Sequence, residues 1–137
     1  MISSVMCLAL NLYFEARSES LAGQLAVGFS TMNRVADKHY PNDVCSVVKQ
    51  AKYNGYSEYP IRHKCQYSWF CDGMSDEPTN DKAMLEATIL ASNIYYGLVT
   101  DISNGATHYH ATWIDAPSWT SEMTKVVTID QHIFYRY

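Results

Sequence analysis

The chain places its helical patterns before its strand patterns, and this order constrains the fold more than any other feature of the sequence. Apolar residues recur at helical spacing in three long segments, and DVCSVVKQ predicts a shorter helix. The long segments cover about residues 3–17, 20–37 and 80–96. Strand patterns occur only in the tail, in THYHATW, VVTI and HIFYR. Because helices and strands do not alternate, we predict an α+β fold, compact and mainly helical, with a small antiparallel sheet.

The long helices have recognisable ends and faces. Ser20 is a suitable N-cap for the second helix, and Gly97 a suitable end for the last one. The expected buried faces are Val5, Leu8, Leu12 and Glu15 in the first helix, Leu21, Leu25, Gly28, Phe29, Met32 and Val35 in the second, and Met84, Leu85, Thr88, Ala91, Ile94 and Tyr95 in the last. Gly and Pro residues interrupt the stretch 52–77, which predicts a loop with QYSWF as a short strand.

Length and charge narrow the class of protein. A chain of 137 residues fits a single domain over residues 1–137. The net charge of −4 and the lack of a basic patch argue against a nucleic-acid partner. No apolar run approaches the roughly 18 residues of a membrane span, and the start lacks a basic leading segment and a small-residue cleavage site. We expect a monomer without a membrane span and without an export signal of its own.

The four cysteines leave two alternatives open. Cys7, Cys45, Cys65 and Cys71 allow two disulfides in three pairings, or four free thiols. A bridge between Cys65 and Cys71 would pin the QYSWF loop. Zinc has little support, because no paired C-x-x-C spacing exists.

Glu15 is the candidate acid of the chain. It lies in the last turn of the first helix, on the apolar side, where burial and the negative end of the helix dipole both raise the pKa of a carboxyl group. A carboxyl group that keeps its proton near neutral pH can protonate a leaving oxygen, which glycosidic cleavage requires. Spacing alone favours a simpler interpretation, an ion pair with Arg17. Glu19, one turn further on, is better interpreted as a residue at the start of the second helix, where a negative charge is favoured.

The remaining titratable groups do not single out a second catalytic residue. A glycoside hydrolase usually needs a second carboxylate, and the candidates by type are Asp72, Asp76, Glu77, Asp101 and Asp115. A lytic transglycosylase does not need one, because the 6-hydroxyl of the substrate attacks the anomeric carbon. His108 and His110 share one side of a strand and could meet a metal with His132, but we expect no metal, since no third ligand has a clear spacing.

Several separated blocks together resemble one family. The segments ALNLYFEARSESLAGQLAVGFSTMNRV, PNDVCSVVKQ, CQYSWFCDG, GATHYHATWIDAPSW and IDQHIFYRY follow, in order, the pattern of the SleB-type cell wall hydrolases, the spore cortex-lytic enzymes. The resemblance covers nearly the whole chain. It implies a lysozyme-like or lytic transglycosylase-like fold, peptidoglycan as the substrate, cleavage between N-acetylmuramic acid and N-acetylglucosamine, and no cofactor.

The resemblance also assigns site residues. Glu15 matches the glutamate of the EAR motif and is the expected general acid and base. The expected substrate-binding residues are Gln66, Tyr67, Trp69, Tyr109 and His110, although Tyr109 and His110 face opposite sides of a strand. Trp113 and Trp119 are expected to be packing residues. The alternatives are a muramidase-type hydrolase, a metal-dependent amidase and an inactive wall-binding module.

Two positions depart from the family pattern. Ser18 and Asp130 stand where the family usually has glycine, so the turns at these positions must form without glycine's freedom. No export signal or wall-binding module is seen, which resembles a phage lysin or a virion-associated enzyme.

Overall fold

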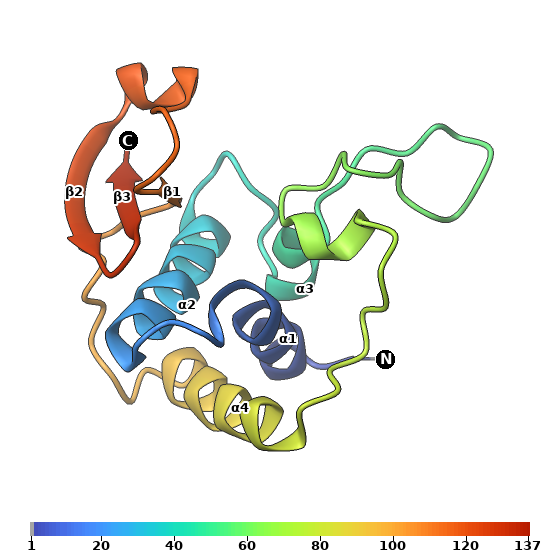
Figure 1. Cartoon of the computed structure of the whole chain (residues 1–137), viewed down its shortest axis with the longest axis horizontal. Coiled ribbons are helices and arrows are strands. Elements are labelled where there is room, and N and C mark those ends of the chain that lie inside the picture. Colours follow the sequence, from blue (N-terminus) through green and yellow to red (C-terminus); the bar gives the residue numbers. More distant parts are fainter. Residues whose placement is uncertain (1) are drawn as a thin grey trace.

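The computed structural model describes residues 2–137 and has the predicted α+β architecture. The helices α1 (Ser4–Ala16), α2 (Leu21–Ala36), α3 (Val44–Val48) and α4 (Asp81–Tyr95) precede the strands β1 (His108–Ala111), β2 (Thr124–Ile129) and β3 (His132–Arg136). Two 3₁₀ turns, η1 (Ser68–Cys71) and η2 (Ser118–Glu122), lie in the connecting segments. Figure 1 shows the helices grouped together, with the sheet on one side and the loop after α3 extending on the other.

Each α-helix begins at a side chain that accepts a hydrogen bond from a backbone amide of its first turn. Ser3, Ser20, Asp43 and Asn80 act in this way. Just beyond α4, Gly97 takes a φ of +73°, a left-handed conformation that glycine adopts without steric cost. The predicted cap at Ser20 and the predicted stop at Gly97 are therefore confirmed.

Helix α1 packs against α2, α3 and α4 and is the centre of the core. The contact of α2 with its neighbours depends on Gly28. A Cβ atom at this position would lie 2.5 Å from Cδ1 of Ile94 and 3.3 Å from Cδ2 of Leu12. Glycine thus allows α2 to approach α1 and α4 closely. This packing sets the relative positions of α1 and α2, the two helices that contribute residues to the site.

Some residues that were predicted to lie on the buried faces of the helices are exposed. Leu21 is 65% exposed, Leu85 61% and Tyr95 38%, so none of these belongs to the core. The buried side of α2 is instead shifted toward small and polar residues, which are Gly23, Ala26, Val27, Gly28, Ser30, Thr31 and Arg34. Apolar periodicity could not locate this face, because several of its members are polar. The QYSWF segment is also not a strand, since it forms η1.

The three strands form an antiparallel sheet in the order β1-β3-β2, which confirms the three strand predictions. Asp130, in the turn between β2 and β3, has a φ of +51°. Its Oδ2 accepts hydrogen bonds from the backbone amide of Ser20, at 3.1 Å, and from the Ser20 hydroxyl. A carboxylate at the start of α2 is favoured by the helix dipole, so this turn ties the sheet to that helix.

The other departure from the family pattern, Ser18, needs no unusual backbone. Ser18 does not have a positive φ, and the amide of Glu19 closes the turn on the carbonyl of Ala16 at 3.0 Å. Both turns thus form without glycine at these positions.

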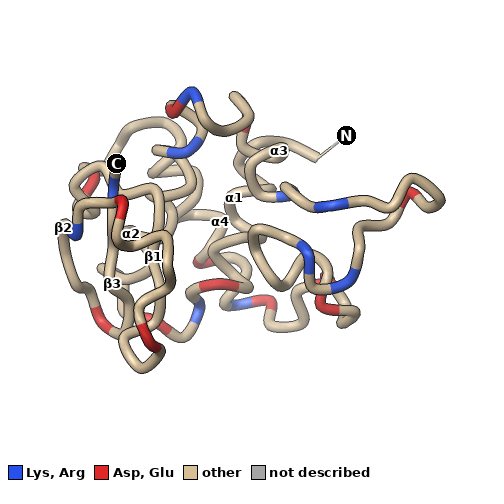
Figure 2. Tube along the Cα trace, turned by 90° about the horizontal axis from the view of Figure 1, so that it is seen from above, with Lys and Arg blue, Asp and Glu red and all other residues tan. Residues whose placement is uncertain are grey.

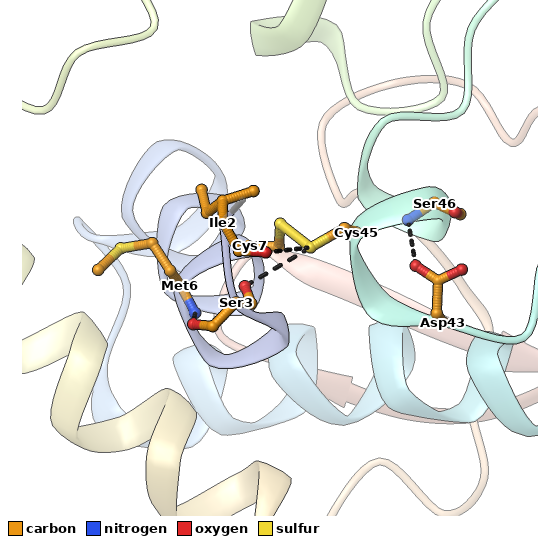
Figure 3. Close-up of a disulfide and its surroundings, with 7 residues drawn as sticks. All are labelled: Ile2, Ser3, Met6, Cys7, Asp43, Cys45 and Ser46. Carbon is orange, nitrogen blue, oxygen red and sulfur yellow. Dashed lines mark hydrogen bonds between the residues drawn. A yellow bond between two sulfur atoms is a disulfide. The ribbon is translucent and has the colours of Figure 1, made fainter.

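Two disulfides are present and no cysteine is free. Cys7 of α1 is bonded to Cys45 of α3, as Figure 3 shows, and Cys65 is bonded to Cys71 at the two ends of the QYSWF segment. Of the two alternatives that the sequence left open, the structure shows the disulfide-bonded one. Over residues 2–137, none of the helices combines the length and the apolar character that crossing a membrane would require.

Candidate functional site

A pocket of about 280 Å³ lies where the end of α1, α2, the segment before η1 and the first strand come together. Its lining residues are Glu15, Arg34, Gln66, Tyr67, Ser68, His108, Tyr109 and Trp119. The pocket is small and its wall is largely polar and aromatic, a composition that suits a sugar ring. Three of the predicted substrate-binding residues, Gln66, Tyr67 and Tyr109, lie in this wall together with Glu15.

Glu15 is the titratable group that the pocket perturbs most clearly toward neutral pH. Burial raises the pKa of its carboxyl group from 4.5 to about 7, while the charge of Arg34 opposes this rise. Arg17 is not its partner, because the Arg17 guanidinium lies over the Tyr13 ring, 4.4 Å from the ring centroid. The ion pair that spacing favoured is therefore absent. Near pH 7 the carboxyl group is divided between its acid and base forms.

Arg34 is a pocket residue that the sequence analysis missed. It is 4% exposed, its Nε donates to the carbonyl of Thr107 at 2.6 Å, and its guanidinium lies over the rings of Tyr40 and Tyr67. Its Nη1 is buried and has no hydrogen-bond partner among the described residues. The signal in the sequence was the NRV block, where a charged residue interrupts the buried side of a helix.

A buried chain of hydrogen bonds holds the wall of the pocket in place. Trp69 Nε1 donates to Asn11 at 2.9 Å, and the Asn11 amide donates to Thr31 at 3.2 Å. The Thr31 hydroxyl lies 3.1 Å from the Tyr67 hydroxyl. Because the chain joins α1, α2 and the segment at η1, it fixes the side chain of Tyr67 at the edge of the pocket.

Trp69 and His110 do not line the pocket, contrary to expectation. Trp69 is 8% exposed and stacks on Phe14, with ring centroids 4.9 Å apart. His110 is 7% exposed and lies 2.9 Å from the Tyr135 hydroxyl. Both side chains are buried in contacts with other residues and are not among those that line the pocket, so their expected role in substrate binding stays a prediction.

The other two tryptophans also differ from expectation. Trp119, expected to be a packing residue, lines the pocket and contacts the rings of His108 and His110. Trp113, expected to be packed, is 69% exposed. The wall of the pocket on the sheet side is therefore made by Tyr109, His108 and Trp119.

The three tail histidines are spread over both faces of the sheet. His108 and His110 contact Trp119, whereas His132 lies against Tyr109 and 3.6 Å from a carboxylate oxygen of Glu19. Burial lowers the pKa of His108 to about 4. Among residues 2–137 no three His, Cys, Asp or Glu side chains are grouped so as to hold a metal ion.

Glu15 is the one acidic side chain among the described residues that line the pocket. The candidate second carboxylates Asp72, Asp76, Glu77, Asp101 and Asp115 are not part of the wall. Burial also raises the pKa of the Tyr109 hydroxyl well above its usual range, with the nearby Glu15 charge adding to the effect. The pocket can thus supply one exchangeable proton near neutral pH, next to neutral hydroxyl and amide groups.

Comparison with known proteins gives matches in both sequence and fold. Residues 18–135 match the family model described as cell wall hydrolase, so the match begins just after Glu15. The crystal structure of the catalytic domain of the Bacillus cereus SleB protein has a TM-score of 0.68 and 23% identity, with 97% of this chain and 89% of that one covered. The catalytic domain of the germination-specific lytic transglycosylase SleB from Bacillus anthracis has a TM-score of 0.71 and 22% identity, with coverages of 97% and 93%. At these identities the two structures establish the fold. No curated protein matches the chain.

Proposed function

The chain belongs to the cell wall hydrolase family and is an enzyme of peptidoglycan degradation, and from this premise we propose that Glu15 cleaves the glycan strand by lytic transglycosylation. The bond cut would be that between N-acetylmuramic acid and N-acetylglucosamine. The observation that carries the proposal is a single buried carboxyl group with a pKa of about 7 in a pocket that has no second acid among its described residues.

One carboxyl group suffices for both steps of this reaction. In the first step, protonated Glu15 donates its proton to the glycosidic oxygen, and the bond from this oxygen to C1 of the muramic sugar breaks. In the second step, ionised Glu15 takes the proton of the 6-hydroxyl as that oxygen bonds to C1, which gives a 1,6-anhydro product. The glutamate then carries a proton again and is ready for the next bond. A pKa near the working pH suits both roles.

The wall of the pocket would hold the sugar. We assign Gln66, Tyr67 and Tyr109 to substrate binding, through the Gln66 amide and the two tyrosine hydroxyls, and Trp119 offers an aromatic face to a sugar ring. Arg34 limits the rise of the Glu15 pKa, because its positive charge favours the carboxylate. The fold relative from Bacillus anthracis is described as a lytic transglycosylase, which supports the same route.

Mass spectrometry of the muropeptides released from purified sacculi tests the proposal. Anhydromuramic ends are expected, and reducing ends would show the muramidase-type hydrolase instead. Release of peptides without new glycan ends would point to an amidase and would refute the assignment of Glu15. A monomeric state and an origin as a phage lysin remain predictions from the sequence.

A further inference from the structure

A short two-stranded ribbon lies beside the Glu15 pocket. The bridge between Ala51 and Cys65 is antiparallel. The backbone amide of Lys52 donates to the carbonyl of Lys64 at 3.0 Å, and the backbone amide of Gln66 donates to the carbonyl of Gln50 at 2.9 Å. Because side chains alternate along paired strands, Gln50, Lys52, Lys64 and Gln66 share one face of the ribbon.

A groove of about 200 Å³ lies on this face of the ribbon. It is lined by Gln50, Ala51, Lys52, Lys64 and Gln66. Gln66 also lines the Glu15 pocket, so the groove and the pocket share a wall residue. The disulfide at Cys65 holds the ribbon to η1, whose first residue, Ser68, also lines the pocket. A molecule bound at Glu15 therefore has a fixed groove next to it.

Two lysines lie directly opposite each other in this groove without an acidic partner. Like charges in opposed positions of a ribbon are destabilising. Neither Lys52 nor Lys64 forms an ion pair with any described carboxylate. The surrounding segment 49–64 holds four of the ten Lys and Arg residues, Lys49, Lys52, Arg62 and Lys64, but a single acid, Glu58, in a chain with a net charge of −4. Figure 2 shows this local excess of basic residues along the loop that extends away from the sheet. The unpaired lysines fit an anionic ligand.

We propose that Lys52 and Lys64 bind a carboxylate of the peptide stem on the same glycan strand that occupies the Glu15 pocket; this rests on the proposed function. Stem peptides are attached to the muramic sugar and carry free carboxylates. Along the ribbon, Lys64 lies about 7 Å beyond Gln66, the length of about two extended residues. A carboxylate near the start of the stem fits this reach. The groove thus makes the enzyme select strands that keep their peptides.

Kinetics on two matched substrates test this role. Both are glycan strands freed of teichoic acid, one with its stems and one stripped of them by an amidase. For the Lys52→Gln/Lys64→Gln double variant we expect a KM raised about three- to tenfold on stem-bearing strands, with kcat unchanged. On stripped strands it should equal the wild type, which also shows that it is folded. The control Lys82→Gln/Lys125→Gln removes two exposed lysines from α4 and β2 and should behave as wild type on both.

Equal losses on both substrates, or no loss on either, would overturn the proposal. A loss that appears only on walls that retain teichoic acid would overturn it in favour of a phosphodiester ligand. Co-sedimentation of the Glu15→Gln protein, with and without the two lysine substitutions, measures binding without cleavage. Weaker binding to stem-bearing strands alone supports the subsite even if the released products contradict transglycosylation, so the two proposals fail separately.

Discussion

Glu15 and Arg34 line the same pocket, yet they do not form an ion pair. Arg34 is held by its bond to the Thr107 carbonyl and by the rings of Tyr40 and Tyr67. Its charge lowers the pKa of the Glu15 carboxyl group without fixing that group in the ionised form. A direct ion pair would hold the carboxylate ionised and remove its use as an acid, so the separation of the two side chains keeps the proton available.

The Glu15→Gln variant should lose activity and gain stability. Without a proton donor, cleavage is expected to fall about a hundredfold or more. The pKa of Glu15 is raised on folding from 4.5 to about 7, so the contribution of this group to stability is greatest below pH 4.5 and is lost as the pH rises through 7. Glutamine does not titrate, and the variant should be more stable than the wild type at pH 8, by as much as about 3 kcal/mol.

Urea unfolding of both proteins at pH 4 and pH 8 measures this difference. The advantage of the variant should nearly disappear at pH 4, where the wild-type carboxyl group is mostly protonated in both states. Glu19→Gln, one turn further along, is the matched control and should retain most activity. A variant that clears walls as the wild type does would show that Glu15 is not the acid.

The pH profile of activity should depend on Arg34. The first step needs protonated Glu15, so activity is expected to fall as the pH rises through about 7. In Arg34→Met the positive charge is gone, the pKa of Glu15 rises further, and the alkaline limb should move to higher pH. Arg34→Lys keeps the charge and should leave the limb near its wild-type position. Identical limbs in all three proteins would show that Arg34 acts only through packing.

The helices, the cap at Ser20, the helix end at Gly97 and the three strands of the tail could be predicted because their signals are local. Ser20 and Gly97 mark helix ends through their own backbone preferences, and no distant residue is needed to recognise them. The position of Glu15 on the buried side of α1 was also visible from its spacing to Leu8 and Leu12. Its role as the catalytic acid came from the family resemblance and stays a proposal.

The rest of the site depends on contacts between distant segments. Thr31 and Arg34 lie on the buried side of α2, but apolar periodicity does not detect them because their side chains are polar. Their hydrogen-bond partners Tyr67 and Thr107 come from distant parts of the chain. A motif match could not separate Tyr109, which lines the pocket, from Trp69, which is buried and stacks on Phe14. Burial decides between such neighbours, and burial is a property of the assembled fold.

The two disulfides should contribute differently to stability. Cys7 and Cys45 are separated by 38 residues, and Cys65 and Cys71 by 6. The entropy lost by the unfolded chain grows with the closed loop, so replacing the first pair by alanine should cost about 4 kcal/mol and the second about 2 kcal/mol. Denaturant unfolding of the two double variants checks this order. A larger loss for the Cys65 and Cys71 pair would mean that native-state packing, not loop closure, dominates.

The contact between Asp130 and Ser20 predicts a graded effect of substitution at the turn. Asp130→Ala removes the acceptor for the Ser20 amide and leaves a Cβ-bearing residue at a φ of +51°, so a loss of about 2 kcal/mol is expected. Asp130→Gly, the usual family residue, loses the acceptor but relieves the backbone, and should cost about 1 kcal/mol. Asp130→Asn keeps an acceptor in a residue that tolerates this conformation and should cost least. Thermal unfolding of the three variants, alone and combined with Ser20→Ala, isolates the contribution of the Ser20 hydroxyl, because Ser20→Ala removes this donor and leaves the backbone amide in place. Equal losses in the alanine and glycine variants would show that the backbone conformation at this turn carries no cost, and that the carboxylate alone anchors the sheet to α2.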